Sequence, residues 1–256
     1  MKQIRQSEGI DRRHSMLDYI EEHKKVSVKE LASIFSVSEM TIRRDLHALE
    51  DLGIVTTYYG GASLKEDRLM VPSFSKRTDT DNQYKKVIGR KAASFIQNGD
   101  TVFIDVSTTV FQLLRYLPDI QLNIITNSMP VIDAVRNNPK VKLFLAPGLY
   151  NREMDGMADL STLSYFSKFL VDKAFIGAIG CSLNYGITST AEIEGAIKQK
   201  MCENAKESFL LVDHTKFHRN GAIFQNHFHD FDYILTDYDV DDRVKKKLDN
   251  LILCEG

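Results

Sequence analysis

The chain has 256 residues, of which 43% are hydrophobic and 27% charged, and its formal net charge is −2. This composition is typical of a globular protein with room for two domains. No apolar run approaches the roughly 20 residues that a membrane helix requires, and the polar N-terminus lacks the apolar segment of a secretory signal. Three scattered cysteines, Cys181, Cys202 and Cys254, have no zinc-site spacing. We therefore expect a cytoplasmic protein with buried thiols, no metal, no other cofactor and no membrane partner.

The first predicted elements are two short helices. Residues 13–23 place three apolar side chains at helical spacing, namely Met16, Leu17 and Ile20. Residues 27–35 begin with Ser27 and have Glu30 three positions later, the capping-box pattern that satisfies free N–H groups at a helix start. Both segments are short enough to pack against a third helix.

A third helix and a hairpin complete this part of the chain. Ser38 is the expected N-cap of the third helix, whose apolar stripe at i, i+4 and i+7 consists of Ile42, Leu46 and Leu49. Residues 53–62 are rich in Val, Thr and Tyr and contain two glycines, which indicates a β-hairpin. Residues 1–65 are therefore predicted to form a winged helix-turn-helix, with the helix-turn-helix at about 26–45 and the wing at about 53–62.

Arg43 and Arg44 have two interpretations. Adjacent arginines on a helix usually form a solvated face, and residues 1–65 hold ten basic and ten acidic side chains, so no overall positive field favours DNA. The second helix of a helix-turn-helix, however, enters the major groove, where arginine discriminates guanine. We favour the second interpretation. The candidate DNA-binding residues are Ser27, Ser38, Thr41, Arg43, Arg44, His47, Tyr58 and Tyr59.

The pattern changes after a polar segment. Residues 66–82 are the predicted linker, and residues 83–256 alternate apolar β-rich runs with helical segments, which is typical of a largely parallel sheet covered on both faces. Strands are expected at 101–106, 122–126, 141–146, 173–180, 208–213 and 232–237. Helices are expected at 84–97, 109–117, 129–136, 158–170, 191–206 and 241–251.

One strand-to-helix turn in this second domain has the composition of an anion cradle. Asp105, Ser107, Thr108 and Thr109 follow a predicted parallel strand and precede a helix. Free N–H groups and hydroxyls at such a turn favour a phosphate. Hydroxyl residues also cap many helices without binding any ligand, so the turn alone does not decide between the two roles.

Longer motifs resemble the DeoR-type regulators of bacterial sugar metabolism. The run "VSVKELASIFSVSEMTIRRDLHALEDLG", followed by "GGA", matches the signature of that family, and "IITNS", "APG", "DKAFIGAIGCSLNYGITS", "AEIEGAIKQKM" and "LLVDHTKF" follow in the expected order. The resemblance implies a sensor domain similar in fold to ribose-5-phosphate isomerase and CoA transferases. It also implies a pocket for a phosphorylated sugar or polyol, lined by Asp105, Ser107, Thr108, Thr109, Thr126, Asn127, Gly148 and Lys216.

The chain departs from the family pattern in three places. The wing carries Thr56, Thr57 and two tyrosines where arginines and a histidine are usual. Ser107 stands where a glycine is usual, and Pro147 replaces the first glycine of a "GG" pair. The departures at Ser107 and Pro147 raise the hypothesis of a constitutive DNA binder that has lost effector sensing.

An enzyme is the other alternative, because "DGMAD" at 155–159 resembles the acidic catalytic loop of the isomerase but contains an extra methionine. No acid and base pair at a clear spacing replaces that loop, so no catalytic residue is assigned. Among the histidines near the C-terminal end, only His227 and His229 are close in sequence, and they lack carboxylate support for a metal. Cys181 is expected to be buried, and an exposed helix would explain Glu194 and Lys198 as an i, i+4 pair.

The sequence thus predicts a DNA-binding transcriptional regulator, a repressor of a carbohydrate catabolism operon, controlled by a phosphorylated sugar or polyol. One reading helix covers one half-site on double-stranded operator DNA, so a homo-oligomer, dimer or tetramer, is expected.

Overall fold

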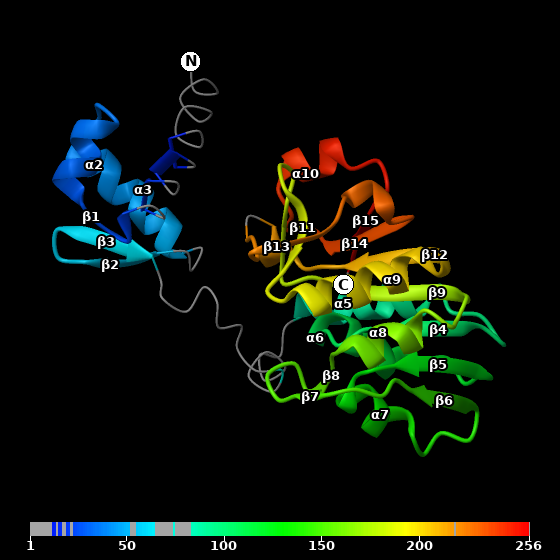
Figure 1. Cartoon of the computed structure of the whole chain (residues 1–256). Helices are drawn as coiled ribbons and strands as arrows, with labels where there is room; N and C mark the ends of the chain where they lie inside the picture. Colours follow the sequence, from blue (N-terminus) through cyan, green and yellow to red (C-terminus); the bar gives the residue numbers. More distant parts are fainter. Residues whose placement is uncertain are drawn as a thin grey trace. The chain divides into compact units, whose positions relative to one another are not determined.

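The computed structural model describes residues 12–13, 15–16, 19–20, 23–51, 55–64, 74, 83–217 and 219–255. Leu17, His218 and all of the predicted linker except Phe74 lie outside this range. The chain divides into two compact units, Met1–Met70 and Val71–Gly256, which are described separately (Figure 1). Within the described residues, no helix is both long enough and apolar enough to cross a membrane.

The N-terminal unit is a winged helix-turn-helix. It contains α2 (Val28–Ile34), α3 (Glu39–Asp51) and a three-stranded antiparallel sheet of order β1-β3-β2, formed by β1 (Lys25–Ser27), β2 (Val55–Tyr58) and β3 (Gly61–Leu64). The predicted capping box is present, because the Ser27 hydroxyl accepts from the Glu30 N–H and the Glu30 carboxylate accepts from the Ser27 N–H. The core contains the predicted stripe of α3 and one side of the first helical segment: Met16, Ile20, Val26, Val28, Leu31, Ile42, Leu46, Leu49, Val55 and Ala62.

The second unit is built on a seven-stranded parallel sheet (Figure 1). Its strand order is β15-β14-β12-β9-β4-β5-β6, and every neighbouring pair is parallel. The strands are β4 (Thr101–Ile104), β5 (Leu122–Thr126), β6 (Val141–Leu145), β9 (Val171–Gly177), β12 (Ala205–Leu211), β14 (Tyr233–Asp237) and β15 (Leu251–Cys254). Their near-continuous apolar sequences reflect burial on both faces.

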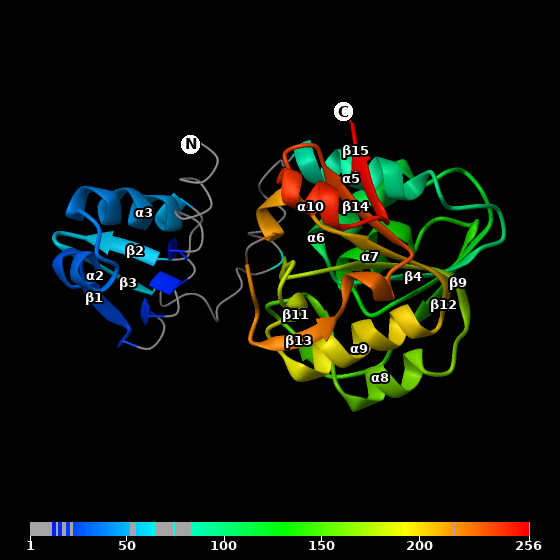
Figure 2. The ribbon, with the colours of Figure 1, turned by 90° about the horizontal axis from the view of Figure 1, so that it is seen from above.

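Helices cover both faces of this sheet. One face packs against α5 (Gln83–Ala93), α6 (Thr108–Phe111), η2 (Gln112–Tyr116) and α7 (Met129–Val135). The opposite face packs against α8 (Leu160–Phe166), α9 (Glu192–Glu203) and α10 (Asp242–Lys247). Figure 2 shows α8 and α9 on one side of the sheet and α5 on the other.

Two small antiparallel sheets and two short helical turns complete the unit. They are β10 (Gly180–Ser182), β11 (Gly186–Ser189) and β13 (Ile223–Asn226), the hairpin β7 (Tyr150–Asn151) and β8 (Gly156–Met157), and the turns η3 (His214–Lys216) and η4 (Phe228–Asp230). Residues 173–180, predicted as one strand, therefore contain the end of β9 and the start of β10. The predicted helix at 241–251 is wrong at its end, because Leu251 begins β15. The helix predicted at 158–170 is confined to 160–166.

The order of the strands creates a switch point beside β4. The chain runs from β4 through β5 to β6 on one side of β4, and then places β9, β12, β14 and β15 on the other side. In open α/β sheets, the crevice at the carboxyl ends of the strands at such a reversal is the common ligand position. The predicted cradle follows β4 directly, so it lies at this point.

Candidate functional site

The two faces of α3 have opposite properties. Ile42 and Leu46 are buried in the core of the N-terminal unit. Arg43, Arg44 and His47 are exposed on the outer face. Arg43 lies 3.7 Å from Glu39 across one helical turn, an exposed ion pair that solvent and salt weaken. The outer face can therefore present basic and hydrogen-bonding side chains to a polyanion without disturbing the core.

Asp45 fixes this helix to the first helical segment, a role that sequence reasoning missed. Its side chain is 2% exposed. The Arg12 Nε donates to the Asp45 Oδ2 at 2.7 Å, a second Arg12 nitrogen lies 2.7 Å from the same oxygen, and Arg13 lies 3.8 Å from Oδ1. The two arginines thus orient α3 from its inner side. Asp45 lies in phase with Ile42 and Leu49, and this was the available sequence signal.

The hydroxyl residues at the helix starts act as caps. The Ser38 hydroxyl accepts from the Thr41 N–H at 3.2 Å and lies 2.9 Å from the Thr41 hydroxyl. The Ser27 hydroxyl accepts from the Glu30 N–H at 3.1 Å. Ser27 and Ser38 are exposed at helix starts, where free N–H groups favour phosphate.

The contacts of Thr57 explain part of the departure of the wing from the family pattern. The Glu50 carboxylate accepts from the Thr57 N–H at 2.7 Å and from the Thr57 hydroxyl at 2.6 Å. These hydrogen bonds lower the pKa of Glu50. Thr57 is therefore an anchor between the wing and α3. A long cationic side chain at this position would lose the hydroxyl bond to Glu50.

The two wing tyrosines differ. The Tyr58 ring packs against Gly61, where a Cβ would collide with it, and its hydroxyl donates to the Val26 carbonyl at 3.3 Å. Tyr59 is fully exposed beside Gly60, whose φ of +88° forms the tip of the hairpin. Tyr59 is thus the tyrosine that can reach a partner, whereas Tyr58 mainly holds the hairpin against β1.

Asp105 joins β4 to β9 at the switch point. Its N–H donates to the Phe175 carbonyl at 3.1 Å, and its carboxylate accepts from the Gly177 N–H at 2.9 Å. The carboxylate is 2% exposed and lies 3.4 Å from the Lys198 Nζ. Burial raises the pKa of Asp105, and the Lys198 charge and the Gly177 N–H oppose that rise.

The interpretation of Lys198 as part of an exposed helix is wrong. Its side chain is buried, and its Nζ lies 3.1 Å from Glu194, 3.1 Å from the Gly177 carbonyl and 3.4 Å from Asp105. Burial alone would lower the pKa of Lys198, but the two carboxylates outweigh it and raise the pKa. Lys198 is therefore the internal cation of the switch point, contributed by α9.

The next cradle residues surround the start of α6. Ser107 has a φ of −132°, so the backbone does not require the glycine that the family carries, and its side chain fills the space beside Gly177. Thr108 and Thr109 are buried. The Thr108 hydroxyl accepts from the Nζ of Lys85, a buried lysine of α5, at 3.1 Å. Lys85 is a second cation beside the cradle that sequence reasoning missed.

Thr126 and Asn127 lie at the neighbouring strand end. The Thr126 hydroxyl donates to the Ile104 carbonyl at 2.7 Å and accepts from the Ser128 N–H at 3.1 Å, so it ties β5 to β4. The Asn127 Nδ2 donates to the Met157 carbonyl at 2.7 Å. Its Oδ1 is buried without a hydrogen-bond partner in the structure. Such an acceptor is costly to leave unpaired, and a ligand hydroxyl could satisfy it.

Gly148 follows β6 and Lys216 lies in η3 after β12, whereas Asp105 follows β4. Gly148 has a φ of +150°, and a Cβ there would collide with Thr162 of α8. Lys216 is half-buried in η3, and its charge acts on the buried thiol of Cys181. Burial raises the pKa of Cys181, so this thiol is not a nucleophile at neutral pH.

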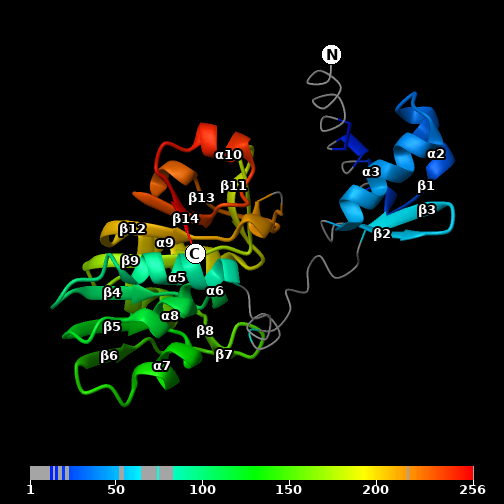
Figure 3. The same cartoon turned by 180° about the vertical axis from the view of Figure 1, so that it is seen from behind.

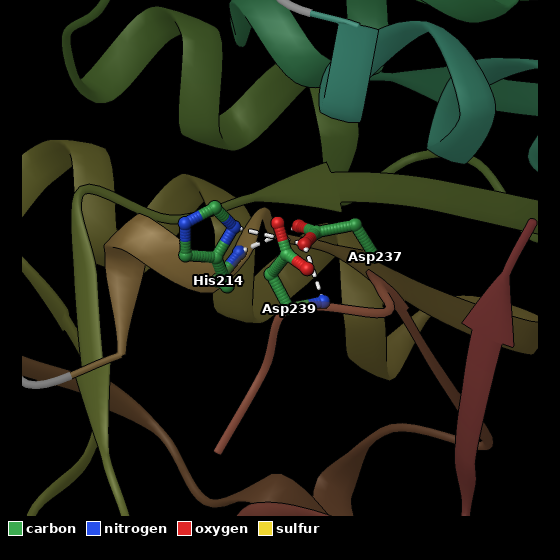
Figure 4. Close-up of side chains that lie close together, drawn as sticks. All are labelled: His214, Asp237 and Asp239. Atoms are coloured by element: carbon green, nitrogen blue, oxygen red, sulfur yellow. Dashed lines mark hydrogen bonds and ion pairs between the residues drawn. The ribbon is translucent and has the colours of Figure 1, made fainter. Parts of the chain in front are cut away.

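A histidine and two carboxylates meet after β12 and β14 (Figure 4). One possible ligand atom from each of His214, Asp237 and Asp239 lies within 4.8 Å of the others. Asp237 is already engaged, since it accepts from the His214 N–H and faces the His214 Nδ1, both at 2.8 Å. Tyr84 packs its ring edge-on to His214 at 4.6 Å, and its hydrogen bond with Asp239 raises the pKa of Tyr84. This cluster links the first turn of α5 to the loops that follow β12 and β14.

The "DGMAD" carboxylates have structural partners. Asp159 caps α8 by accepting from the N–H groups of Ser161 and Thr162, and Asp155 accepts from the Tyr150 hydroxyl at 2.8 Å. The rings of His227 and His229 stack with centroids 5.0 Å apart.

A winged helix-turn-helix whose second helix exposes two arginines, joined in one chain to a parallel α/β unit, defines a DNA-binding transcriptional regulator. Residues 12–68 match the family model of the DeoR-like helix-turn-helix domain, and residues 80–238 match that of the DeoR C terminal sensor domain. The chain belongs to the DeoR family.

Named relatives agree with this assignment. The chain is 34% identical to the HTH-type transcriptional regulator IolR and 32% identical to the HTH-type transcriptional repressor GlcR, both from Bacillus subtilis (strain 168). These matches cover 89% and 87% of this chain and 90% and 86% of the relatives. It is 31% identical to the glycerol-3-phosphate regulon repressor of Escherichia coli (strain K12), over 93% of this chain and 92% of the relative.

Among solved structures, ribose 5-phosphate isomerase A from Methanocaldococcus jannaschii is similar over 53% of this chain and 54% of that chain. The TM-score is 0.38 and the sequence identity 15%.

Proposed function

We propose that this chain represses a carbohydrate catabolism operon by reading operator DNA with α3, and that a phosphorylated sugar or polyol bound at the β4–β9 switch point controls it. The observation that carries the proposal is the presence, in one DeoR-family chain, of an exposed helix face with two arginines and of a cradle of buried polar groups at the switch point. The regulator acts in the cytoplasm, where its operator lies. Residues 1–65, 66–82 and 83–256 serve as the DNA-binding domain, the linker and the sensor domain.

DNA contacts follow from the geometry of α3. Arg44 is exposed near the start of the helix, where side chains of a reading helix meet base edges. Thr41, Arg43 and His47 extend the same face, and Ser27, Ser38 and Tyr59 are placed for phosphate or sugar contacts. Tyr58, which is 47% exposed, adds to this surface next to Tyr59.

Replacing Arg44 by alanine is expected to relax base preference at one operator position, because a bidentate arginine–guanine contact contributes about 1–3 kcal/mol of discrimination. Selection from a pool of random DNA duplexes, before and after the substitution, measures this preference. Lys29→Ala is the matched comparison, since Lys29 is exposed on the first helix of the motif. It should weaken binding to all sequences alike. An unchanged preference in the Arg44 variant would exclude direct reading by this arginine.

Effector binding is supported by charge and by hydrogen-bonding capacity. Lys85 and Lys198 place two buried cations around Asp105 and Thr108. The unpaired Asn127 Oδ1 can accept a hydrogen bond from a ligand hydroxyl. Ser107, Thr109, Thr126 and Gly148 shape the surrounding strand ends. Lys216, on the loop after β12, would reach a phosphate as a flexible point charge.

The cognate effector at about 100 times its dissociation constant is expected to raise the free energy of unfolding by about 2.7 kcal/mol. Thermal shift of the full chain against glycerol 3-phosphate and a set of hexose phosphates measures the effect, with the corresponding unphosphorylated compounds as controls. Lys216→Ala should abolish the shift, whereas Lys246→Ala, on the exposed side of α10, should retain it. Intact DNA binding with no shift from any phosphate would favour the constitutive binder.

An isomerase-like enzyme is the competing function. The two carboxylates of the acidic loop are occupied as a helix cap and as a turn partner, which supports the regulator. Turnover of ribose 5-phosphate by the purified protein would reverse this choice.

A further inference from the structure

The free edge of β6 differs from the rest of the sheet. β6 is the last strand in the order, and β5 is its one partner strand among the described residues (Figure 3). All four apolar residues of this strand are at least partly exposed, and Leu145 is 47% exposed. β4 and β5 instead bury nearly every residue. An uncovered apolar edge without proline or a bulge is a template for pairing with another strand.

The backbone of β6 has a defined polarity at this edge. The Lys140 carbonyl accepts from the Leu122 N–H at 3.0 Å, and the Ala146 N–H donates to the Thr126 carbonyl at 2.9 Å. In a parallel ladder, alternate residues direct both backbone groups to the same neighbour. The even-numbered residues therefore bond to β5. Leu143 and Leu145 direct their N–H and carbonyl groups outward.

We infer that β6 pairs antiparallel with β6 of a second copy of this chain, with Leu143 on the two-fold axis. This inference rests on the proposed function, which requires two reading helices on a repeated operator. In this register the two Leu143 residues exchange hydrogen bonds, and the Leu145 N–H of each copy meets the Val141 carbonyl of the other. The Val141 N–H is already satisfied by the Asn138 carbonyl at 3.0 Å, and the pairing does not need it.

The side chains of β6 are self-complementary in the same register. Lys142 of one copy lies opposite Phe144 of the other. Within one copy the Lys142 Nζ already lies 5.2 Å from the centroid of the Phe144 ring, so the pairing extends a cation–aromatic contact. A shift of two residues in one direction would place the two Lys142 side chains opposite each other, and like charges there are destabilising. Charge therefore disfavours the register centred on Lys142, and the Lys142–Phe144 contact favours the register centred on Leu143.

The ends of β6 are also suited to contact with a second copy of the chain. Lys140 forms an ion pair with Asp119 at 2.6 Å, so its charge is compensated at one end. Beyond the other end, Leu149, Tyr150 and Leu160 are exposed, and Leu149 is held next to the start of α8 because its N–H donates to Asp159 at 3.0 Å. These residues add exposed apolar side chains to the segments that follow Leu145 in the chain. An apolar, charge-balanced edge is typical of contact between identical subunits.

Sedimentation of the full chain, with and without Leu145→Lys, tests the pairing. The wild type should sediment as a dimer or a multiple of it. The variant should weaken the self-association at least about 10-fold, because two lysines would be placed at the paired edge. Leu145→Pro should do the same, since the N–H that it removes points away from β5. The matched control is Tyr185→Lys, which alters an exposed aromatic residue between β10 and β11 and should leave the mass unchanged.

A disulfide test reports the register and does not depend on those variants. The double variant Lys142→Cys/Phe144→Cys should form an intersubunit disulfide under mild oxidation, because opposed residues in a non-hydrogen-bonded antiparallel pair have Cα atoms about 4.5 Å apart. Lys142→Cys alone should not crosslink, and the three native cysteines are buried.

Unchanged mass in both Leu145 variants, or equal crosslinking of the single and double cysteine variants, would overturn the β6 interface. If, in either case, the chain were still a dimer that selects specific duplexes, this inference would fail and the proposed function would stand. A chain that is dimeric through β6 but selects no DNA sequence would overturn the proposed function and leave the β6 interface standing.

Discussion

Replacing Lys198 by methionine is expected to lower the free energy of unfolding of the α/β unit by about 3–5 kcal/mol. The substitution nearly preserves side-chain volume but removes the cation that faces Asp105 and Glu194. Asp105 is 2% exposed, so water cannot replace the lost partner. Breaking a buried pair on one side is costly because the remaining charge stays in a medium of low dielectric constant.

Two further variants separate this effect from a general loss of packing in α9. Lys200→Met changes a partly exposed lysine of the same helix, whose partner Glu203 is at the surface, and should cost less than about 1 kcal/mol. Adding Asp105→Asn to Lys198→Met should recover part of the loss, because the second change removes the unpaired charge. Hydrogen exchange of β4 and β9 amides in the full chain measures the stability of this unit. Equal costs for Lys198→Met and Lys200→Met would contradict a buried ion pair.

The pH dependence of the Lys198 variant has a definite sign. Burial already raises the pKa of Asp105 in the wild type, and loss of the lysine raises it further. A carboxyl group with a raised folded-state pKa stabilises the fold below its unfolded pKa of about 3.9, and this stability is lost as the pH rises through the folded value. The deficit of the variant relative to the wild type should therefore be larger at about pH 8 than at about pH 5.

The sequence determines the periodic features of this chain well. The stripe of Ile42, Leu46 and Leu49, the capping box at Ser27 and the central strands of the sheet follow from local spacing and local hydrogen bonds. The DeoR family assignment, made from the motifs, is confirmed. The ends of elements were less certain because tertiary contacts decide them. The apolar run at 251–254 pairs with β14, so tertiary pairing overrides its apparent helical continuation.

Charged residues with distant partners were the main errors. Lys198 has the i, i+4 spacing of a surface pair with Glu194, and only the packing of α9 against β9 and β12 shows that it is buried. Its partner Asp105 lies 93 positions earlier in the sequence. Lys85 likewise meets Thr108 across 23 residues. For such charged residues, the one local sign of burial was a position within the apolar stripe of a helix. Their charge made this sign easy to overlook.

Replacing Asp45 by asparagine is expected to lower the stability of the N-terminal unit by about 2–4 kcal/mol and to abolish specific DNA binding. Asparagine retains the shape of the side chain but no longer compensates Arg12, whose two nitrogens lie 2.7 Å from the Asp45 carboxylate. A hydrogen-bonded charge pair with one buried partner is strongly destabilised when that charge is removed. The effect is at the lower end of the usual range because Arg12 is partly exposed.

The same helix offers a matched control for Asp45. Glu39→Gln removes the carboxylate of the exposed pair with Arg43, and such a pair contributes about 0.3–0.5 kcal/mol. Amide exchange of α3 in the full chain should accelerate about 30-fold or more in the Asp45 variant and about 2-fold in the Glu39 variant. If Asp45→Asn left exchange unchanged but still abolished sequence selection, Asp45 would act on DNA recognition alone. If both measurements stayed at wild-type values, Arg12 and Arg13 would not be the groups that orient α3, and the apolar stripe would hold the reading helix by itself.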